Sequence, residues 1–382
     1  MDDALLTSGE VAQLLRVHPK HLYRLLRQGL PGHRVGRGHW RFRRAEVLAW
    51  FDQRGSGRGR GRASATEPRS SSPSVIPALD VESDAVEVEL APGQSLPAGA
   101  HRVLLGQVRS RWVAHPMGDR SSRCADALVS AEAPARRPCQ GVRAIPLSRS
   151  STFGANILVA GCAPVLGLIL DRLEHGHAGR LHWISVNSTT SLELLTAGFV
   201  HVAGVHLEDP AAGAGHAALV RTRFPGVRTH LVRLLRWRTG LVVRPSECGR
   251  DLAELLGPSH RWVLREAGAG ALRVLSRVLG GLGMSIEALR VARVATSHRE
   301  VAQAVSLHGA DVGVTVEAVA REAGLRFIPL TEEGFDLVVP HDIATERSIA
   351  RMLDALDDPA LRREIGVLGS YDASMMGHAT TP

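Results

Sequence analysis

"NILVAGCAPVLGLILDRLEHG", residues 156–176, is the stretch that decides the fold of this chain. Its first six residues form an apolar run typical of a buried strand, and residues 163–176 follow with the apolar spacing of a helix. The alternation continues at once, with a strand expected at 181–187, a helix at 188–198 and a strand at 201–207. Repeated strand–helix units predict a parallel sheet flanked by helices, which places this part of the chain in the α/β class.

The same alternation runs almost to the end of the chain. Further strands are expected at 240–245, 261–266, 288–295, 311–316, 326–330 and 335–340, and further helices at 251–257, 268–283, 297–309, 317–324 and within 347–369. We therefore interpret residues 151–382 as one α/β domain, called the body below.

Four strand-to-helix joints of the body share one chemistry. Each has small or hydroxyl residues where a helix begins, so each exposes backbone N–H groups at the positive end of a helix dipole. At any single joint, ordinary helix capping explains these residues. Four joints together predict an anion site, because ligands of such folds lie at the carboxyl ends of the strands. The joints are Gly161-Cys162-Ala163, Ser188-Thr189-Thr190, Gly268-Ala269-Gly270 and Thr296-Ser297-His298.

Several stretches of the body resemble a known family. These are residues 157–173, 181–209, 262–275, 297–340 and 368–377. They resemble the periplasmic-binding-protein-like domain that often follows a helix-turn-helix, which is similar to molybdate- and tungstate-binding periplasmic proteins and also occurs fused to molybdopterin-biosynthesis proteins. The resemblance implies two α/β lobes that close on a ligand by a hinge motion.

The resemblance also implies which residues bind the ligand. In the oxyanion binders, backbone N–H groups and Ser or Thr hydroxyls at these joints hold a tetrahedral anion, so molybdate or tungstate is the expected ligand, with no other cofactor. Two positions of the first joint depart from the family: Cys162 stands where many oxyanion binders have serine, and Ala163 where an acidic residue is frequent. By position, the ligand-binding residues are Gly161, Cys162, Ser188, Thr189, Gly268, Ala269, Gly270 and Ser297.

Motifs of metal sites and of common enzymes are missing from the sequence. Cys124, Cys139, Cys162 and Cys248 are scattered without a C-x-x-C pair, which argues against a zinc ribbon or a disulfide framework. His175, His177, His182, His201 and His206 form no i, i+4 pair beside a helical glutamate. Neither a Walker A loop nor a G-x-S-x-G elbow occurs, and residues 268–270 lack the third glycine of a dinucleotide loop. We therefore expect no metal site, no catalytic residues and no enzyme activity.

The charge of the chain is concentrated at its start. The formal net charge is +8, and residues 1–62 contain 13 Lys and Arg against 5 Asp and Glu, so the remaining residues are neutral overall. A basic head on a neutral body suggests that the head binds a polyanion.

The pattern of the head predicts a winged helix-turn-helix over residues 1–53. Ser8 or Thr7 is a suitable N-cap with Glu10 in the first turn, and Pro19 opens a second apolar helical run that ends at Gly29. Residues 33–42 alternate across a glycine-containing turn, as in a β-hairpin, and residues 43–54 form a third helix.

Residues 6–51 resemble the excisionase-type, MerR-related winged helix-turn-helix family, through T-x-x-E-V-A-x-L-L, Y-x-L-L and W-R-F. The second helix is expected in the major groove of double-stranded DNA and the wing on its backbone. The alternative is a solvated basic face on a small protein–protein module. The expected DNA-binding residues are His18, Lys20, His21, Arg24 and Arg27 on the helix and Arg37, His39 and Arg41 in the wing.

Two segments join the head to the body. Residues 54–74 are rich in Gly, Ser and Arg and read as a flexible linker, whose arginines either add phosphate contacts or do no more than solvate it. Residues 75–150 contain short apolar runs at 102–108 and 109–115 that suggest strands. This segment is either part of the body fold, a degenerate copy of it, or a separate small module.

Together these features predict a one-component transcriptional regulator that senses a small anion. A homodimer is expected, because one small module makes few base contacts. The alternatives are a molybdenum-cofactor biosynthesis or metal-insertion protein and an excisionase-like architectural DNA binder. We expect a cytoplasmic protein without membrane contact, because no signal peptide is evident and the longest apolar run, 155–170, is interrupted by Gly161 and Pro164.

Overall fold

The computed structural model describes residues 5–15, 22, 25–26, 30–35, 39–55, 85–92, 96, 99–117, 123–131, 141–147, 150–174, 179–207, 215–247, 252–257 and 259–382. The chain divides into two compact units, Met1–Ser74 and Val75–Pro382. Each unit has a hydrophobic core of its own.

The first unit is a small sheet with helices. Its antiparallel strands have the order β1-β3-β2, where β1 is Leu5–Thr7, β2 is His33–Val35 and β3 is His39–Arg43. Helix α1 (Ser8–Leu14) begins with a capping box, since the Thr7 N–H donates to the Glu10 carboxylate at 2.7 Å and the Glu10 N–H donates to Thr7 Oγ1 at 3.4 Å. Of the two predicted N-cap residues, Ser8 and Thr7, it is therefore Thr7 that caps the helix. Helix α3 (Arg44–Gly55) confirms the third predicted helix.

The core of this unit contains Val11, Leu22, Leu30, Phe42 and Val47. Most of the predicted second helix lies outside the described residues, but the described Leu25 and Leu26 pack against this core.

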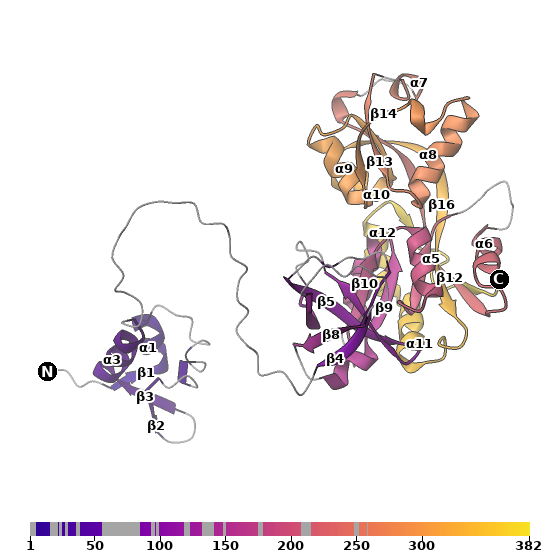
Figure 1. The fold of residues 1–382 in the computed structure, drawn as a ribbon. Helices are drawn as coiled ribbons and strands as arrows, with labels where there is room; N and C mark the ends of the chain where they lie inside the picture. The colour runs from indigo at the N-terminus through magenta and orange to yellow at the C-terminus, as the bar shows by residue number, and fades with distance from the viewer. Residues whose placement is uncertain are drawn as a thin grey trace. The chain divides into compact units, whose positions relative to one another are not determined.

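The second unit contains a two-lobed α/β body. In the first lobe, β10 (Leu181–Ser185), β9 (Ile157–Gly161) and β11 (Val202–Val205) are parallel neighbours, with α4 (Val165–Glu174), α5 (Ser188–Thr196) and α6 (Gly215–Arg223). In the second lobe, β15 (Val312–Val316), β13 (Arg261–Arg265) and β14 (Arg290–Ala295) are parallel, with α7 (Leu252–Leu255), α8 (Gly270–Gly281) and α9 (His298–Ser306) (Figure 1). The predicted parallel strand–helix units are confirmed in both lobes.

Two long antiparallel strands run through both lobes. They are β12 (Thr229–Val243) and β16 (Arg326–Pro340), and they sit between β11 and β15 in the sheet. The predicted strands at 326–330 and 335–340 are therefore one strand. The predicted strand at 240–245 is only the end of β12, whose first part was not predicted because Arg233, Arg236 and Arg238 interrupt the apolar pattern.

The C-terminal segment packs on the first lobe. After α10 (Glu317–Glu322) and β16 come α11 (Arg347–Asp354) and α12 (Pro359–Val367), as predicted for 347–369. The short strands β17 (Tyr371–Asp372) and β18 (Ala379–Thr380) then pair with β12.

Five strands between residues 86 and 146 form a closed barrel. The strands β4 (Val86–Leu90), β5 (Gly99–Val108), β6 (Arg111–Pro116), β7 (Ala127–Ala131) and β8 (Gly141–Pro146) close in the order β4-β6-β5-β7-β8. The strands predicted at 102–108 and 109–115 correspond to β5 and β6. Inward side chains such as Val103, Leu105 and Val129 form a core distinct from that of the body.

The barrel contacts the body at the end of α5. The Arg111 Nη2 donates to the carbonyl oxygens of Ala197 and Gly198 at 2.7 and 3.0 Å, and His115 Nε2 lies 2.7 Å from the carbonyl oxygen of Phe199. Ala197 is the C-cap of α5. The barrel is thereby attached to the residues where this helix ends.

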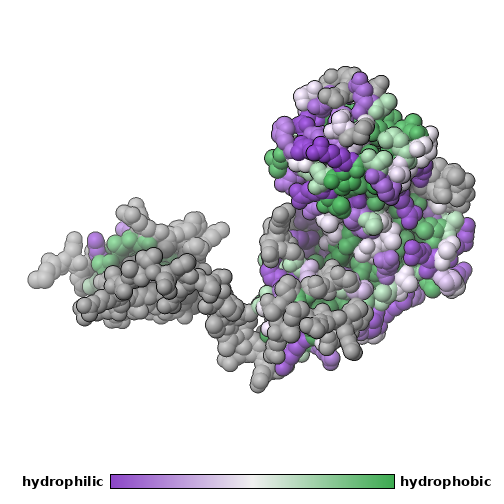
Figure 2. All heavy atoms as spheres, turned by 45° about the horizontal axis from the view of Figure 1, so that its top comes forward, coloured by the Kyte–Doolittle hydropathy of each residue, from purple (hydrophilic) through white to green (hydrophobic). Residues whose placement is uncertain are grey.

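The surface of the second unit is mixed in polarity. Figure 2 shows hydrophilic residues spread over the visible face of the body, with hydrophobic residues in smaller groups between them. Within the part of the chain that the structure describes, there is no helix with both the length and the apolar character required to cross a membrane.

Candidate functional site

The predicted joints of the body meet where the two lobes face each other. The Thr189 hydroxyl of α5 donates to the Gly268 carbonyl oxygen of the second lobe at 2.9 Å, and Asn187 Nδ2 donates to the Ala267 carbonyl oxygen at 3.3 Å. Asn187 is also the N-cap of α5 and accepts from the Thr190 N–H. Two joint residues, Thr189 and Gly268, thus connect the lobes directly, and their neighbours Asn187 and Ala267 make a second connection.

Gly268 and Gly270 are required by close approach. Gly268 has φ of +88°, a left-handed conformation that favours glycine, and a Cβ at Gly270 would lie 2.4 Å from His206 Cε1 and 2.5 Å from the His206 carbonyl oxygen. Ala269 between them is the N-cap of α8 and is buried. The second-lobe joint therefore lies directly against His206, which follows β11 of the first lobe.

The remaining predicted residues surround the same point. The Ser188 hydroxyl accepts from the His206 N–H at 3.2 Å, and Cys162 follows Gly161 at the end of β9. The Gly161 carbonyl oxygen accepts from Trp183 Nε1 at 2.7 Å. Ser297 caps α9 by accepting from the Glu300 N–H, and its neighbour His298 enters the site.

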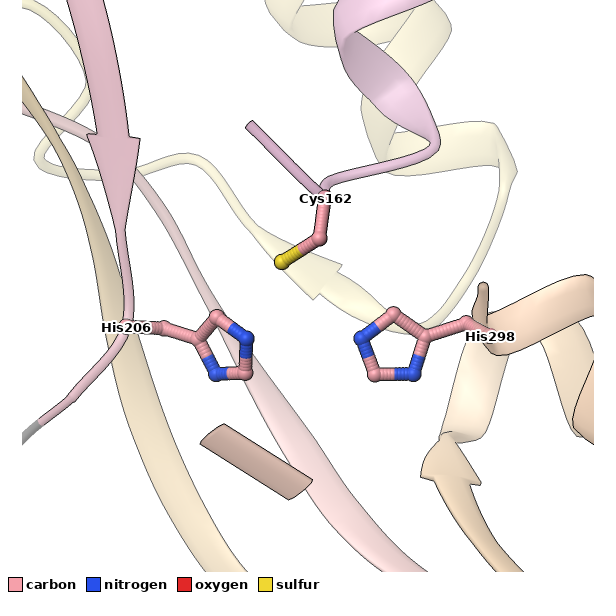
Figure 3. Close-up of side chains that lie close together, drawn as sticks. All are labelled: Cys162, His206 and His298. Atoms are coloured by element: carbon pink, nitrogen blue, oxygen red, sulfur yellow. The ribbon is translucent and has the colours of Figure 1, made fainter. Parts of the chain in front are cut away.

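Cys162, His206 and His298 form the centre of the site. All three are buried, and one potential ligand atom from each lies within 4.8 Å of the other two. Figure 3 shows that each imidazole turns a nitrogen toward the other ring and toward Cys162 Sγ. Cys162 and His206 come from the first lobe and His298 from the second, so the cluster spans the interface between the lobes.

Of these three, the sequence patterns assigned Cys162 as a ligand-binding residue and placed His298 in the fourth joint without assigning it, while His206 belonged to no predicted joint. His206 and His298 lie far from Cys162 and from each other in the chain, so they form no short motif. Their positions directly after a strand and at the start of a helix were the available signal, since such positions gather at one edge of the sheet.

Aromatic rings and a carboxylate enclose the cluster. Trp237 of β12 packs 5.0 Å from the His206 ring and 5.8 Å from the His298 ring, centroid to centroid, and Phe335 packs 6.0 Å from His206. On the other side of the His206 ring, Glu333 Oε2 lies 3.5 Å from Nδ1 and accepts from the Thr239 hydroxyl at 2.6 Å.

The charges in this enclosed space are coupled. Burial favours the neutral form of His206, but Cys162 and Glu333 raise its pKa to about 10. Burial likewise opposes ionisation of Cys162, yet His206 and Arg265 hold the pKa of the thiol below its ordinary value. Burial, with the charges of Arg265 and His206, holds the pKa of His298 well below its ordinary value. Cys162 and His206 therefore each favour the charged form of the other, whereas burial favours the neutral form of His298.

Several buried polar atoms around the site have no hydrogen-bond partner among the described residues. They include His298 Nε2, Trp237 Nε1 and Arg265 Nη1. The other guanidinium nitrogens of Arg265 donate to Glu266 at 2.9 and 3.0 Å. Unpaired buried groups are costly, so their concentration here indicates a place built for a ligand.

Few of the predicted DNA-binding residues can be located. His18, Lys20, His21, Arg24, Arg27 and Arg37 lie outside the described residues. His39 opens β3, and Arg41 lies in the same strand with its Nη1 donating to the Trp40 carbonyl oxygen at 3.0 Å. The strands β2 and β3 form the predicted hairpin of the wing.

Comparisons with known proteins agree with the two-part organisation. Residues 5–55 match the model of a helix-turn-helix domain, and residues 170–357 match that of the PBP superfamily domain. The chain therefore combines an N-terminal helix-turn-helix domain with a body of mixed α/β periplasmic-binding-protein-like fold.

Individual relatives are distant. The uncharacterized protein YvgK of Bacillus subtilis (strain 168) is 25% identical over 225 residues, which cover 58% of this chain and 72% of YvgK. A putative phosphate ABC transporter substrate-binding protein from Clostridium perfringens is 11% identical with a TM-score of 0.43, covering 57% of this chain and 99% of that one. The LysR family transcriptional regulator CbnR is 16% identical with a TM-score of 0.37, covering 55% of this chain and 69% of that one.

Proposed function

We propose that this protein is a transcriptional regulator that binds double-stranded DNA through its head and changes its DNA affinity when the body binds a small ligand. The observation that carries the proposal is the buried site between the lobes. Its polar groups come from joints of both lobes, and several of them lack partners among the described residues. A domain with this site and a helix-turn-helix in one chain suits a sensor with its own DNA-binding output.

The closed arrangement explains how such a ligand acts. Cys162 is 7% exposed, and Ser188, His206 and His298 are 0–1% exposed, so a ligand enters only when the lobes separate. The lobes are joined by β12 and β16, which shift register between Thr239 and Gly240. A ligand that contacts both lobes favours the closed state over the open one, and this difference in affinity is what a switch requires.

For the ligand we propose a small oxyanion, with molybdate or tungstate favoured. The unpaired Trp237 Nε1–H and Arg265 Nη1–H are donors, His206 is cationic, and the amino ends of α5, α8 and α9 add their positive dipoles. This set attracts a compact anion without a lysine in contact with it.

Calorimetry of the full-length protein with molybdate, tungstate, sulfate and phosphate tests the oxyanion. We expect one anion to bind per chain, with molybdate or tungstate binding more tightly than sulfate. If none of the four produces heat, the oxyanion proposal is wrong, whereas the regulator proposal is tested separately by DNA binding.

The DNA-binding proposal is tested with duplexes that are selected from a random pool for binding to the protein. Fluorescence anisotropy then measures the affinity of the protein for a selected duplex with and without the bound anion. We expect the anion to change the affinity of the selected duplex by at least about fivefold, which corresponds to a coupling free energy of roughly 1 kcal/mol. An affinity that does not respond to any small ligand would instead favour an architectural DNA binder.

We further propose that the regulator acts as a homodimer in the cytoplasm. A two-fold pair of heads doubles the base contacts that one small head can make. Sedimentation of the protein with and without the selected duplex tests this, and the selected sequence is expected to contain two inverted half-sites.

A further inference from the structure

The central cluster has the composition of a transition-metal site. A thiol sulfur and two imidazole nitrogens converge from three different strand–helix joints and lie within 4.8 Å of one another (Figure 3). Zn–S and Zn–N bonds measure about 2.0–2.3 Å. A metal ion placed between the three ligand atoms would therefore need them to move only slightly closer together.

The His298 ring is oriented so that its free lone pair points into the cluster. Its Nδ1 lies 3.3 Å from Thr315 Oγ1, and that hydroxyl donates its own hydrogen to the His298 carbonyl oxygen at 3.1 Å. The Thr315 oxygen can therefore only accept from Nδ1–H. In a neutral imidazole the proton on Nδ1 leaves Nε2 as a bare acceptor, and this buried Nε2 has no hydrogen-bond partner among the described residues.

The His206 ring is oriented in the matching way. Its Nδ1 faces Glu333, 3.5 Å from Oε2, and Glu333 is itself fixed by the hydrogen bond from Thr239. Nδ1 makes no hydrogen bond among the described residues, so this carboxylate acts on the ring through its charge. A carboxylate behind one ring nitrogen favours the tautomer in which the other nitrogen binds a metal, and this arrangement is common around metal-binding histidines. The nitrogen turned toward Cys162 Sγ is the one in position to bind (Figure 3).

An ion pair between Cys162 and His206 would not by itself account for the cluster. Such a pair explains Cys162, His206 and Glu333, but it gives no role to the unpaired Nε2 of His298. The positive charge of Arg265 is compensated by Glu266, and the Glu333 carboxyl group lies 3.5 Å from the His206 ring. The local charge therefore permits a bound cation.

We propose that Cys162, His206 and His298 bind one thiophilic transition-metal ion, Zn²⁺ or Cu⁺. Thiolate and imidazole ligands favour these ions over Mg²⁺ or Ca²⁺, which prefer oxygen. Since His298 belongs to the other lobe, the ion joins the two lobes. The inference rests on the proposed function in that it names a second ligand class for the same interlobe site.

Metal binding to tag-free, full-length protein tests this proposal. The protein is stripped with a chelator, loaded separately with Zn²⁺ or with Cu⁺ under anaerobic reducing conditions, desalted, and analysed for metal per chain. Co²⁺ serves as a spectroscopic probe, because a thiolate ligand gives it an intense near-ultraviolet charge-transfer band. We expect one ion per chain for one of the two metals and a thiolate band with Co²⁺.

Matched variants locate the site. C162S is expected to remove the thiolate band and to weaken binding at least about 100-fold, and H298N at least about tenfold. The controls are C124S and H308N, which replace an exposed cysteine and an exposed histidine and are expected to bind like the unmodified protein. Circular dichroism of the metal-free variants establishes that they are folded, and metal-induced stabilisation in a thermal melt provides a second readout.

The proposal is overturned if the unmodified protein binds less than one ion per chain, or if C162S and H298N bind metal like the controls. Calorimetry with the oxyanions is repeated on the metal-free protein. An oxyanion that still binds there leaves the proposed function standing even if the metal site fails.

Discussion

The Thr189 hydroxyl of one lobe donates a 2.9 Å hydrogen bond to the Gly268 carbonyl oxygen of the other. Because separation of the lobes would break this bond, T189V is expected to favour opening. A neutral hydrogen bond contributes about 1 kcal/mol, so ligand affinity should fall roughly fivefold while the melting temperature of the unliganded protein changes little.

Calorimetry measures the affinity, and small-angle scattering measures the opening. T222A is the control, since the exposed Thr222 hydroxyl bonds only within its own helix. Equal affinities for T189V and T222A would show that this contact does not govern closure.

The two glycines Gly270 and Gly280 of α8 offer a sharp comparison. A Cβ at Gly270 would clash with the His206 ring and carbonyl oxygen, whereas a Cβ at Gly280 meets nothing within 4 Å. G270A is expected to destabilise the protein by about 1–3 kcal/mol and to reduce ligand binding. G280A should leave binding unchanged and stabilise the exposed helix by up to about 1 kcal/mol. Urea denaturation and calorimetry of both variants check this, and indistinguishable variants would contradict the close packing at Gly270.

His115 makes the stability of the second unit depend on pH. Burial lowers the pKa of this imidazole to about 4, from an ordinary value of 6.5. Above pH 6.5 neither folded nor unfolded state is protonated at this position. Between pH 6.5 and 4 only the unfolded state gains the proton, so stability falls as the pH is lowered, by at most about 3 kcal/mol, and below pH 4 this loss is complete.

The H115Q variant isolates this contribution. Glutamine can still donate to the Phe199 carbonyl oxygen but does not titrate. Urea denaturation at several pH values should show a smaller loss between pH 6.5 and 4 for H115Q than for the unmodified protein. Parallel curves would mean that His115 is not the titrating group.

Arg24 is expected to contact DNA, although it lies outside the described residues. If Arg24 contacts a backbone phosphate beside the major groove, R24A should weaken binding of the selected duplex. The slope of log affinity against log salt concentration should then fall by about 1. R293A, which removes an exposed arginine of the body, is the control and should not change DNA affinity. The same affinity and salt slope for R24A and R293A would exclude Arg24 from the interface.

The body could be predicted from local patterns wherever an element is buried on the expected face. Residues 157–161 and 312–316 are buried throughout and read as strands without ambiguity. The start of β12 could not be predicted, because Arg236 and Arg238 are held by Glu332 and Glu317, partners that only the folded chain brings near. The residues of the four joints were predicted as separate elements, and the fold explains why they meet.

The cluster of Cys162, His206 and His298 could not be predicted from local sequence patterns. The roles of His206 and His298 depend on residues of other strands. Thr315 lies beside the His298 ring, and Glu333 lies beside the His206 ring. Scattered cysteines and histidines in a sequence argue only against a local metal motif. They do not exclude a metal site that is assembled from residues at the ends of several strands.

Helix α5 has its first residues, Ser188 and Thr189, in the interlobe site and its C-cap carbonyl on Arg111 of the barrel. A helix of nine residues is a stiff rod of about 14 Å. The barrel, in turn, stands between the head and the body in the chain order. In the proposed regulator, a ligand bound at the first turn of this helix can therefore act on the barrel at its other end.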